Sequence, residues 1–336
     1  MKKIILSTMA IATIASAGGV TEIKSHVPVI KFSGTHYLGF VSSKTGDDSS
    51  LNKFETRRNY FQAKAYFGEN PKDYARITFD THDNEGDSQV RLKYAYLYLD
   101  NVLPNTGVEF GQVHRPWIDY EEHNGWNYRS ISKTLVEAKN GADITNSADR
   151  GINFKTKTPY FSSELGVFNG EGYHNKEDGK GMSEEWRLTG HILGTGKKKA
   201  KKSSTYANVS FFGQQNSKSN KHGNEDLNWM GLHGVYNQPE FLISAQYIKV
   251  NDGIASKKGK GYSVNGEYRV APKWNTIARY DYFDMDDNSK GDKKRAIGGI
   301  AYEYNKNVEF IANYLKEGGS KIEDHDAVML TAAVEW

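Results

Sequence analysis

The sequence predicts an all-β fold, namely a transmembrane antiparallel β-barrel of about sixteen strands. The first observation is that polar and apolar residues alternate with the period of a strand almost everywhere after Val29, with no convincing helical period. The second is that tight turns and longer polar connections follow each other in alternation along the chain. The third is the segment from His325 to Trp336, which alternates strictly and ends on an aromatic residue. Together these observations predict strands whose two faces meet different media.

The amino-terminal residues have the pattern of a secretory signal. Lys2 and Lys3 supply positive charge, Ile4 to Ile14 form a short apolar core, and Ala15 to Ala17 make a small-x-small cleavage site. The apolar core is too short to cross a membrane, which takes about 20 apolar residues in a helix. We therefore predict a signal peptide at residues 1–17 and a single barrel domain at residues 18–336.

The composition fits an exported barrel and argues against a strongly charged partner. The 336 residues include no cysteine, so stability after export has to come from something other than disulfides. Lys and Arg total 44 against 41 Asp and Glu; without Lys2 and Lys3 the balance is 42 against 41, or about +1. A nucleic-acid partner is not expected at that balance. The 21 tyrosines and 6 tryptophans suit the two interfaces of an outer-membrane lipid bilayer.

The strands can be assigned in order from this alternation. In the segment 59–67, one face is apolar and the other polar: Phe61, Ala63, Ala65 and Phe67 alternate with Tyr60, Gln62, Lys64 and Tyr66. In the segment 90–99, Leu92 and the tyrosines at 94, 96 and 98 fall on one face, opposite Arg91 and Lys93. The predicted strands are 30–41, 59–67, 74–81, 90–99, 107–114, 151–157, 161–168, 185–193, 206–212, 229–236, 241–250, 262–269, 274–283, 295–304, 308–315 and 325–336.

The connections are expected to be short at one end of the barrel and long at the other. Tight turns are predicted at 70–71, 158–159, 237–239, 271–272 and 305–306, and longer loops at 42–51, 82–87, 169–181, 213–226, 251–260, 284–294 and 316–324. In outer-membrane barrels the short turns are periplasmic, so both mature termini are expected at that side. The segment from Gly194 to Ser204 departs from the rule, because it should be short but holds five lysines.

The polar face of the strands is expected to line water. An apolar face must contact lipid, because a charge at the bilayer midplane costs about 2–4 kcal/mol. Charges also cannot stay unpaired in a dry protein interior, whereas about sixteen strands enclose an aqueous channel. The bases predicted to line the pore are Lys64, Arg76, Arg91, Lys93, Arg187, Arg279 and Arg295.

Three features together give the chain a family resemblance. The segment Gly107–Trp117 contains Phe110-Gly111-Gln112 and leads into Arg115-Pro116-Trp117, the longest insertion follows from Arg115 to Ala148, and the closing strand ends at Trp336. With these features the chain, after the signal, resembles the porins of the Gram-negative outer membrane. It is most similar to the branch related to phosphate-selective porins, in which a strand ending near Gly-Gln is followed by a proline and a long loop.

This resemblance implies a function and a place for the insertion. Porins are passive channels for small hydrophilic solutes and ions, without a cofactor, and are commonly homotrimers. Their third extracellular loop folds into the lumen and narrows it. The acids expected on this constriction loop are Asp119, Glu121 and Glu122, facing the bases Lys64, Arg76, Arg91 and Lys93. A solvated loop outside the barrel is the alternative placement, since runs of charge usually face water.

The sequence is compatible with two kinds of ion selectivity. A phosphate-selective pore needs a dense ladder of lumenal bases. The lumenal set here is mixed instead, because acids stand beside bases in Glu185/Arg187, Glu267/Arg269 and Arg279/Asp281. A weakly selective pore is therefore the first expectation, and a phosphate- or anion-selective pore the second.

An outer-membrane enzyme or an adhesin with a blocked lumen is the alternative of another class. The ten histidines form no His-Glu-x-x-His motif. The segment from Asp284 to Asn288 begins like a calcium-binding loop, but Ser289 stands where glycine is required and Arg295 where glutamate is required. No catalytic residue, metal site or cofactor is therefore expected.

Overall fold

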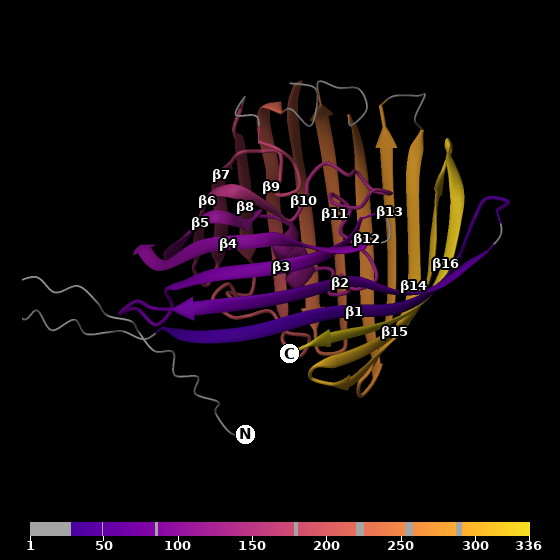
Figure 1. The fold of residues 1–336 in the computed structure, drawn as a ribbon, viewed down its shortest axis with the longest axis horizontal. Helices are drawn as coiled ribbons and strands as arrows, with labels where there is room; N and C mark the ends of the chain where they lie inside the picture. The colour runs from indigo at the N-terminus through magenta and orange to yellow at the C-terminus, as the bar shows by residue number, and fades with distance from the viewer. Residues whose placement is uncertain are drawn as a thin grey trace, which may run out of the picture.

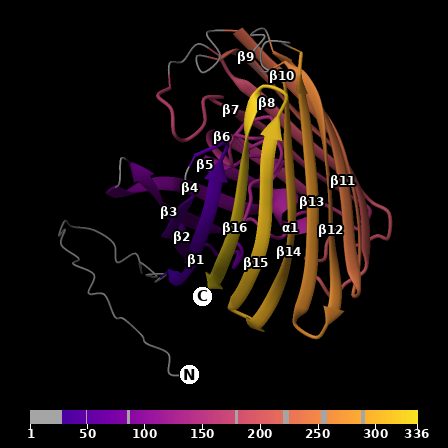
Figure 2. The ribbon, with the colours of Figure 1, turned by 90° about the vertical axis from the view of Figure 1, so that its right-hand side faces the viewer.

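The computed structural model shows a closed barrel of sixteen antiparallel strands (Figures 1 and 2). It describes residues 28–48, 50–84, 87–177, 181–219, 225–252, 258–286 and 291–336. The predicted signal peptide and part of the calcium-loop-like segment lie outside the described residues. The strands pair in sequence order, and the first strand pairs with the last, so no strand edge is left open. The predicted fold class is confirmed.

Each of the sixteen predicted strands is present, and most are longer than predicted. Their bounds in the first half are β1 (Val29–Thr45), β2 (Leu51–Tyr66), β3 (Tyr74–Asn84), β4 (Asp87–Leu103), β5 (Thr106–His114), β6 (Ala148–Lys157), β7 (Phe161–Phe168) and β8 (Ser183–His191). Those in the second half are β9 (Tyr206–Ser219), β10 (Glu225–Gln238), β11 (Phe241–Asp252), β12 (Gly259–Ala271), β13 (Trp274–Met285), β14 (Asp292–Asn305), β15 (Val308–Gly319) and β16 (Ile322–Glu335).

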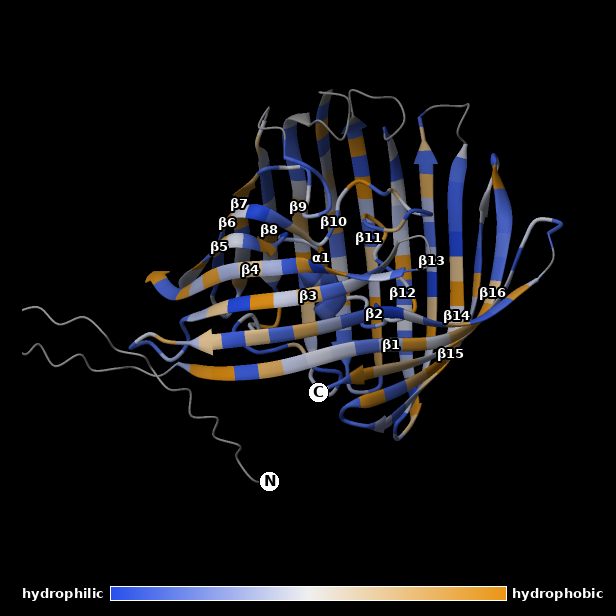
Figure 3. Cartoon of the chain, in the orientation of Figure 1, coloured by the Kyte–Doolittle hydropathy of each residue, from blue (hydrophilic) through white to orange (hydrophobic). Residues whose placement is uncertain are grey.

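The alternation in sequence becomes an alternation between the outer face and the lumen. In β16, Val328 and Leu330 are 52% and 53% exposed, whereas Met329 and Thr331 are buried inside the ring. The hydropathy colouring shows the same alternation along many strands (Figure 3). The outer face is therefore apolar, as hydrocarbon requires.

The fourth strand departs from the predicted faces. Thr78 pairs with Tyr94 and the next residue, Phe79, pairs with Leu92, so Lys93 is an extra residue in a β-bulge. The bulge places Lys93 and Tyr94 both in the interior, where they are 4% and 6% exposed, while Leu92 stays outside. The prediction that Leu92 and the tyrosines share a face is wrong, because one inserted residue reverses the alternation.

The two ends of the barrel differ, but less than predicted. At one end, which we call the short-turn end, residues 104–105, 239–240, 272–273 and 306–307 are tight turns. At the opposite, long-loop end, strands continue through much of the predicted loops 82–87 and 316–324, because β3, β4, β15 and β16 extend beyond the apolar band. The connection 192–205 remains long at the short-turn end.

The first and last strands close the barrel through Gly34 and Trp336. The Gly34 amide donates to the Trp336 carbonyl at 2.9 Å, and the Trp336 amide donates to the Gly34 carbonyl at 3.0 Å. The indole ring covers Gly34 so closely that a Cβ there would lie 2.5 Å from it. Glycine is required at position 34 because only a residue without a side chain leaves room for the ring.

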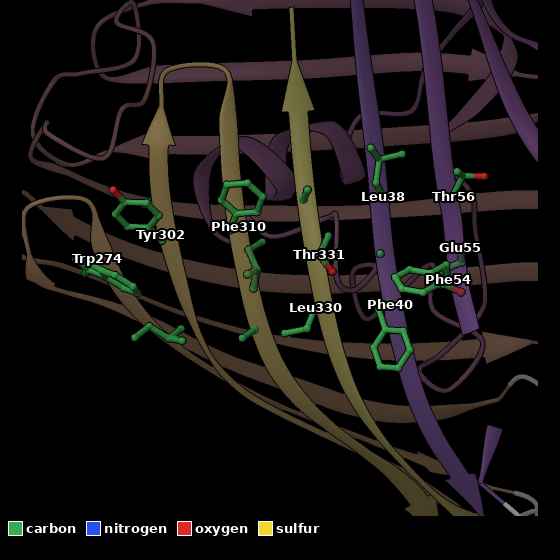
Figure 4. A pocket seen from close by; sticks show the side chains of 15 residues that line it. Leu38, Phe40, Phe54, Glu55, Thr56, Trp274, Tyr302, Phe310, Leu330 and Thr331 are labelled. Atoms are coloured by element: carbon green, nitrogen blue, oxygen red, sulfur yellow. The ribbon is translucent and has the colours of Figure 1, made fainter. Parts of the chain in front are cut away.

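An apolar groove runs over the outer face next to this closure. It is lined from β1, β2 and β13–β16, with Leu38, Phe40, Phe54 and Leu330 among its side chains (Figure 4). The rings of Trp274 and Tyr302 lie against each other near its short-turn edge, with centroids 4.6 Å apart and an angle of 37° between them. Aromatic rings of this kind suit the boundary between hydrocarbon and headgroups.

Candidate functional site

The long insertion between β5 and β6 lies against the inner face of the barrel. It contains the helix α1 (Ile118–Asn124), which the sequence analysis did not predict, and which lies among the strands in Figure 2. The described residues contain no helix of the length and apolarity needed to cross a membrane. Arg187 of β8 donates to the Pro116 carbonyl at 3.2 Å, and Arg295 of β14 donates to the Lys133 carbonyl at 3.0 Å. The insertion is thus fixed to strands on several sides of the lumen.

Apolar side chains hold the insertion on one side. Trp117 stacks on Phe212 of β9 with ring centroids 3.5 Å apart and an angle of 5° between the rings. Leu135 and Val136 are fully buried in the same cluster. Further along, Trp126, Tyr128 and Ile131 of the insertion belong to a second cluster. We call the inner face that receives these residues the docking wall; it consists of Phe212, Leu227, Trp229, Ile248, Val250, Phe283, Met285, Ile277, Ile297, Ala301, Ile311, Ala327, Met329 and Val41.

Two arginines beside the docking wall share one carboxylate. Asp281 accepts from the Nε of Arg279 at 2.9 Å and from the Nε of Arg295 at 2.7 Å. All three side chains are buried under the insertion, and the Arg279 guanidinium lies 4.7 Å from the ring centroid of Trp126. Two of the bases predicted to line the pore, Arg279 and Arg295, therefore support the insertion in this structure.

The opposite side of the lumen contains a cavity of about 570 Å³ that reaches the short-turn end. We call this cavity the basic chamber. Its basic residues are Lys64, Arg76, Lys155, Lys157, Arg187, Lys197, Lys198 and Lys199, its acids are Glu109, Asp119 and Glu164, and its histidines are His114, His123 and His191. Eight bases face three carboxylates, so the chamber carries an excess of positive charge. Three of the bases predicted to line the pore, Lys64, Arg76 and Arg187, border it.

The acids of the basic chamber are largely neutralised by bases other than Lys64 and Arg76. Lys155 lies 3.3 Å from Glu109 and 3.4 Å from Glu164, and Arg187 lies 3.0 Å from Glu164. Lys64 and Arg76 instead face aromatic rings, at 4.6 Å from the Tyr74 centroid and 4.5 Å from the Tyr94 centroid. A tyrosine face attracts a cation without cancelling its charge. These two bases can therefore act on a passing anion.

The three acids predicted for the constriction loop point in different directions. Asp119 lies in the basic chamber, 3.7 Å from the imidazole of His114. Glu121 accepts from Gln246 of β11 at 2.6 Å, and Glu122 forms an ion pair with Arg129 inside the insertion. Of the predicted arrangement, only Asp119 shares a cavity with predicted bases, namely Lys64 and Arg76, whereas Glu121 and Glu122 do not line that cavity. The three acids lie on a helix, where successive residues are rotated by about 100°, and not on an extended loop.

The environment of each acid moves its pKa differently. Burial raises the pKa of Glu121 to about 7, against the opposing effect of Arg279. Burial also acts to raise the pKa of Asp119, but the charges of His114 and His123 outweigh it and hold that pKa well below its usual range. Asp119 is thus a permanent negative charge in the basic chamber, whereas Glu121 is poised between its two forms.

Arg91 and Lys93 face the lumen but lie outside the basic chamber. Arg91 and Arg58 both donate to the buried carboxylate of Asp80, each at 2.9 Å. Lys93 donates to the Tyr60 hydroxyl at 3.0 Å. Both residues, which the alternation placed on the polar face, are inward and are held by their strand neighbours.

Several residues of the basic chamber were missed by the sequence analysis. Glu109, Lys155 and Glu164 lie at inward positions of β5, β6 and β7, respectively, so the alternation along these strands could have identified them. His114 sits at the last position of β5, beside the insertion. The lysines of the connection 192–205 gave no signal of this kind, because a connection has no face.

The closed ring of sixteen strands with a lumenal insertion defines the class of protein: the chain has the fold of an outer-membrane porin of Gram-negative bacteria. Among solved structures it is similar to an anion-selective porin from Comamonas acidovorans, with a TM-score of 0.67 and 12% identity over 92% of this chain and 100% of that chain. It is similar to OmpF of Salmonella typhi, with a TM-score of 0.64 and 13% identity over 92% and 100% of the two chains. OmpT, an outer membrane protein of Vibrio cholerae, has a TM-score of 0.63 and 14% identity over 94% and 99%. No protein-family model and no curated protein sequence matches the chain.

Proposed function

We propose that this protein is a porin of the outer membrane, which lets small hydrophilic solutes and ions diffuse passively and passes anions more readily than cations. The observation that carries the proposal is the basic chamber, where eight bases face three carboxylates beside the insertion. Fixed charge of one sign in a narrow, water-filled space concentrates ions of the opposite sign. The two sides of the lumen thus have different roles. The docking wall binds the insertion, and solutes pass on the side of the basic chamber.

The preference is expected to be modest for most small anions. The whole mature chain has a charge near neutrality, and the excess of base is confined to one part of the lumen. Salt shortens the reach of these charges, because the Debye length is about 10 Å at 0.1 M and about 3 Å at 1 M. A weakly anion-selective diffusion channel fits this arrangement better than a pore dedicated to one ion.

Single-channel recording in planar lipid bilayers tests the proposal. Purified protein should give discrete conductance steps in potassium chloride, and a salt gradient should give a reversal potential on the anion-selective side. An outer-membrane enzyme or an adhesin with a blocked lumen would give no steps, and that result would overturn the proposal. A reversal potential on the cation-selective side would leave a porin but overturn its preference.

We also propose that the channel is a homotrimer, in which copies meet through the outer faces of β1 to β3. Polar side chains cross these faces: His36 bonds to Asn59 at 2.9 Å, and Asn59 donates to Thr81 at 3.0 Å. The Trp336 indole donates to the other nitrogen of His36 at 3.0 Å. Such a polar row suits contact with protein better than contact with hydrocarbon. A similar structure, in-vitro folded OmpT of Vibrio cholerae, is described as a trimer.

Replacing one member of this polar row tests the trimer. Asn59→Leu should shift the protein from trimer to monomer in light scattering after size-exclusion chromatography. The matched control is Thr276→Leu, an exposed polar residue on the outer face of β13. A trimer that tolerates Asn59→Leu as well as the control would show that copies do not meet through this face.

A further inference from the structure

The connection between β8 and β9 has a fixed path at the short-turn end. It covers residues 192–205, whereas the turns at 104–105, 239–240, 272–273 and 306–307 need two residues each. Its backbone forms two successive turns, in which the Lys198 amide donates to Thr195 at 2.9 Å and the Ser204 amide donates to Lys201 at 3.0 Å. Within it, Ala200 packs against a small buried cluster from β9, β10 and β11. We call residues 194–204 the strap.

One end of the strap is tied to the turns next to β5 and β6. The Gly196 amide donates to the Pro159 carbonyl at 2.8 Å, and a Cβ at position 196 would lie 2.3 Å from the carbonyl oxygen of Thr158. Only glycine allows this approach. The Lys197 ammonium then donates to the side chain of Asn105, in the turn between β4 and β5, at 2.8 Å.

The other end of the strap is tied to strands on a different side of the ring. The Lys202 ammonium lies 2.8 Å from Glu303 of β14 and 3.1 Å from Glu309 of β15. Asn237 of β10 donates to the carbonyls of Lys201 and Lys202 at 3.3 Å and 3.2 Å. Since β4 and β14 are far apart in the ring, the strap crosses the mouth of the barrel.

The strap separates two openings of different charge. Gly196 to Ala200 line the basic chamber on one side. Lys202 lines a second cavity of about 300 Å³, where Glu303, Glu309 and Glu335 balance the bases. Lysines 197 to 199 of the strap therefore line the basic chamber and add to its excess of positive charge.

These three lysines face solvent without a carboxylate at ion-pair distance among the described residues. Each is exposed, and none has an ion-pair partner among the residues that the structure describes. Lys197 is bonded to an uncharged amide. Within the same chamber, Lys64 and Arg76 also lack a carboxylate partner among the described residues.

We propose that the strap makes the short-turn mouth of the basic chamber a binding site for small polyvalent anions, with Lys197, Lys198 and Lys199 at its rim and Lys64 and Arg76 inside. Eight bases facing one space that holds only three carboxylates favour a ligand that carries several negative charges over a single chloride. The site opens at the short-turn end, so it makes the channel asymmetric: a polyvalent anion reaches it more easily from that end. The proposal deepens the proposed porin function and rests on it.

Block of the chloride current by inorganic tripolyphosphate tests this site. Tripolyphosphate added on the strap side of single channels in potassium chloride should block at a lower concentration than when added on the opposite side. The chain has no cysteine, so a Ser203→Cys substitution on the exposed strap, read with a membrane-impermeant thiol reagent, identifies the strap side. Replacing Lys197, Lys198 and Lys199 together by glutamine should raise the half-blocking concentration about tenfold, which corresponds to about 1.4 kcal/mol.

A matched triple variant provides the control. Lys201, Lys273 and Lys306 are exposed lysines at the same end of the barrel that do not line the basic chamber. Their replacement by glutamine removes the same charge and should leave the block within about twofold of the unmodified protein. Equal block from the two sides, an unchanged block in the strap variant, or an equal loss in the control would each overturn the binding site. Absence of conductance in the unmodified protein would instead overturn the proposed porin function.

Discussion

The two walls of the lumen use charge in opposite ways. On the docking wall, Arg279 and Arg295 share one carboxylate and lie buried between strand and insertion. On the chamber side, Lys64 and Arg76 face tyrosine rings and open space, without a carboxylate of their own among the described residues. Inward-facing arginines are therefore not equivalent. A base that is paired and covered holds structure together, whereas a base that is unneutralised and open to the cavity acts on solutes.

Removing the shared carboxylate of the docking wall should have the largest effect. Asp281→Asn leaves two buried guanidinium groups without their counter-charge, and breaking a buried ion pair in this way costs about 3–5 kcal/mol. We expect a corresponding loss in the free energy of unfolding, measured in urea with the barrel in detergent micelles. Asp119→Asn, on the chamber side, should change that free energy far less. Equal losses would mean that the two walls do not differ.

A cavity under the insertion should be the next largest change. Leu135 is fully buried against the docking wall, and Leu→Ala at such sites costs about 2–5 kcal/mol. Because the lost contacts join the insertion to the wall, the insertion should move more and the open-channel current should become noisier. Recordings as quiet as those of the unmodified protein would show that these contacts do not hold the insertion in place.

Charge reversal on the chamber side should change selectivity and not stability. Lys64→Glu places a carboxylate in the basic chamber, so the reversal potential in a potassium chloride gradient should shift towards cations. The unfolding free energy should change by about 1 kcal/mol or less, as is usual for partly exposed charges. The same charge change on the docking wall, Arg279→Glu, should instead impair folding.

Asp119 and Glu121 point to different sides of α1, so substituting each in turn tests the two walls separately. The expected change in reversal potential is smaller than for charge reversal. Asp119→Asn removes a negative charge from the basic chamber and should increase the preference for anions. Glu121→Gln should leave that preference unchanged, because Glu121 faces Gln246 and the docking wall. If both substitutions shifted the reversal potential equally, the two acids would share one passage.

The smallest expected effect is a pH dependence of docking-wall stability. Because the pKa of Glu121 is raised to about 7, the folded state holds this proton more tightly than the unfolded chain does. The resulting stabilisation is complete below pH 4, near the pKa of an unfolded glutamate, and is lost as the pH rises through about 7. Unfolding free energies between pH 5 and 8 should therefore decline in the unmodified protein and decline less in Glu121→Gln. Parallel profiles would assign the pH dependence to other groups.

The strands could be predicted from the sequence because their signal is local. Alternation at each segment reports the two media on its two faces, and it located sixteen strands and the inward position of Lys64 and Arg76. It failed for the tyrosines at 94, 96 and 98, since a bulge at Lys93 inserts one residue and reverses the faces after it, which no residue pattern in the sequence indicates. The alternation also underestimated the strand lengths at the long-loop end, because strand residues beyond the apolar band have polar side chains on both faces.

The site could be predicted only in part because it depends on contacts between distant segments. The seven-residue helix α1 is too short to form without packing, so its own sequence carries little helical signal. Whether Arg279 lies open or covered is decided by Trp126, which comes from another part of the chain. The lysines at 197 to 199 were visible, but their place at the chamber mouth depends on Asn105, Pro159 and Glu303, which only the folded ring brings within reach.

The strap also has a mechanical consequence. A barrel of sixteen strands has to withstand the lateral pressure of the surrounding lipid. Lys202 forms ion pairs with β14 and β15, while Gly196 and Lys197 form hydrogen bonds to turns across the mouth. The strap therefore connects distant strands of the ring at the short-turn end. The insertion is likewise fixed to strands on different sides of the ring, β8 and β14. We expect these two connections across the ring to oppose flattening of the barrel and so to keep the cross-section of the passage constant when the surrounding membrane deforms.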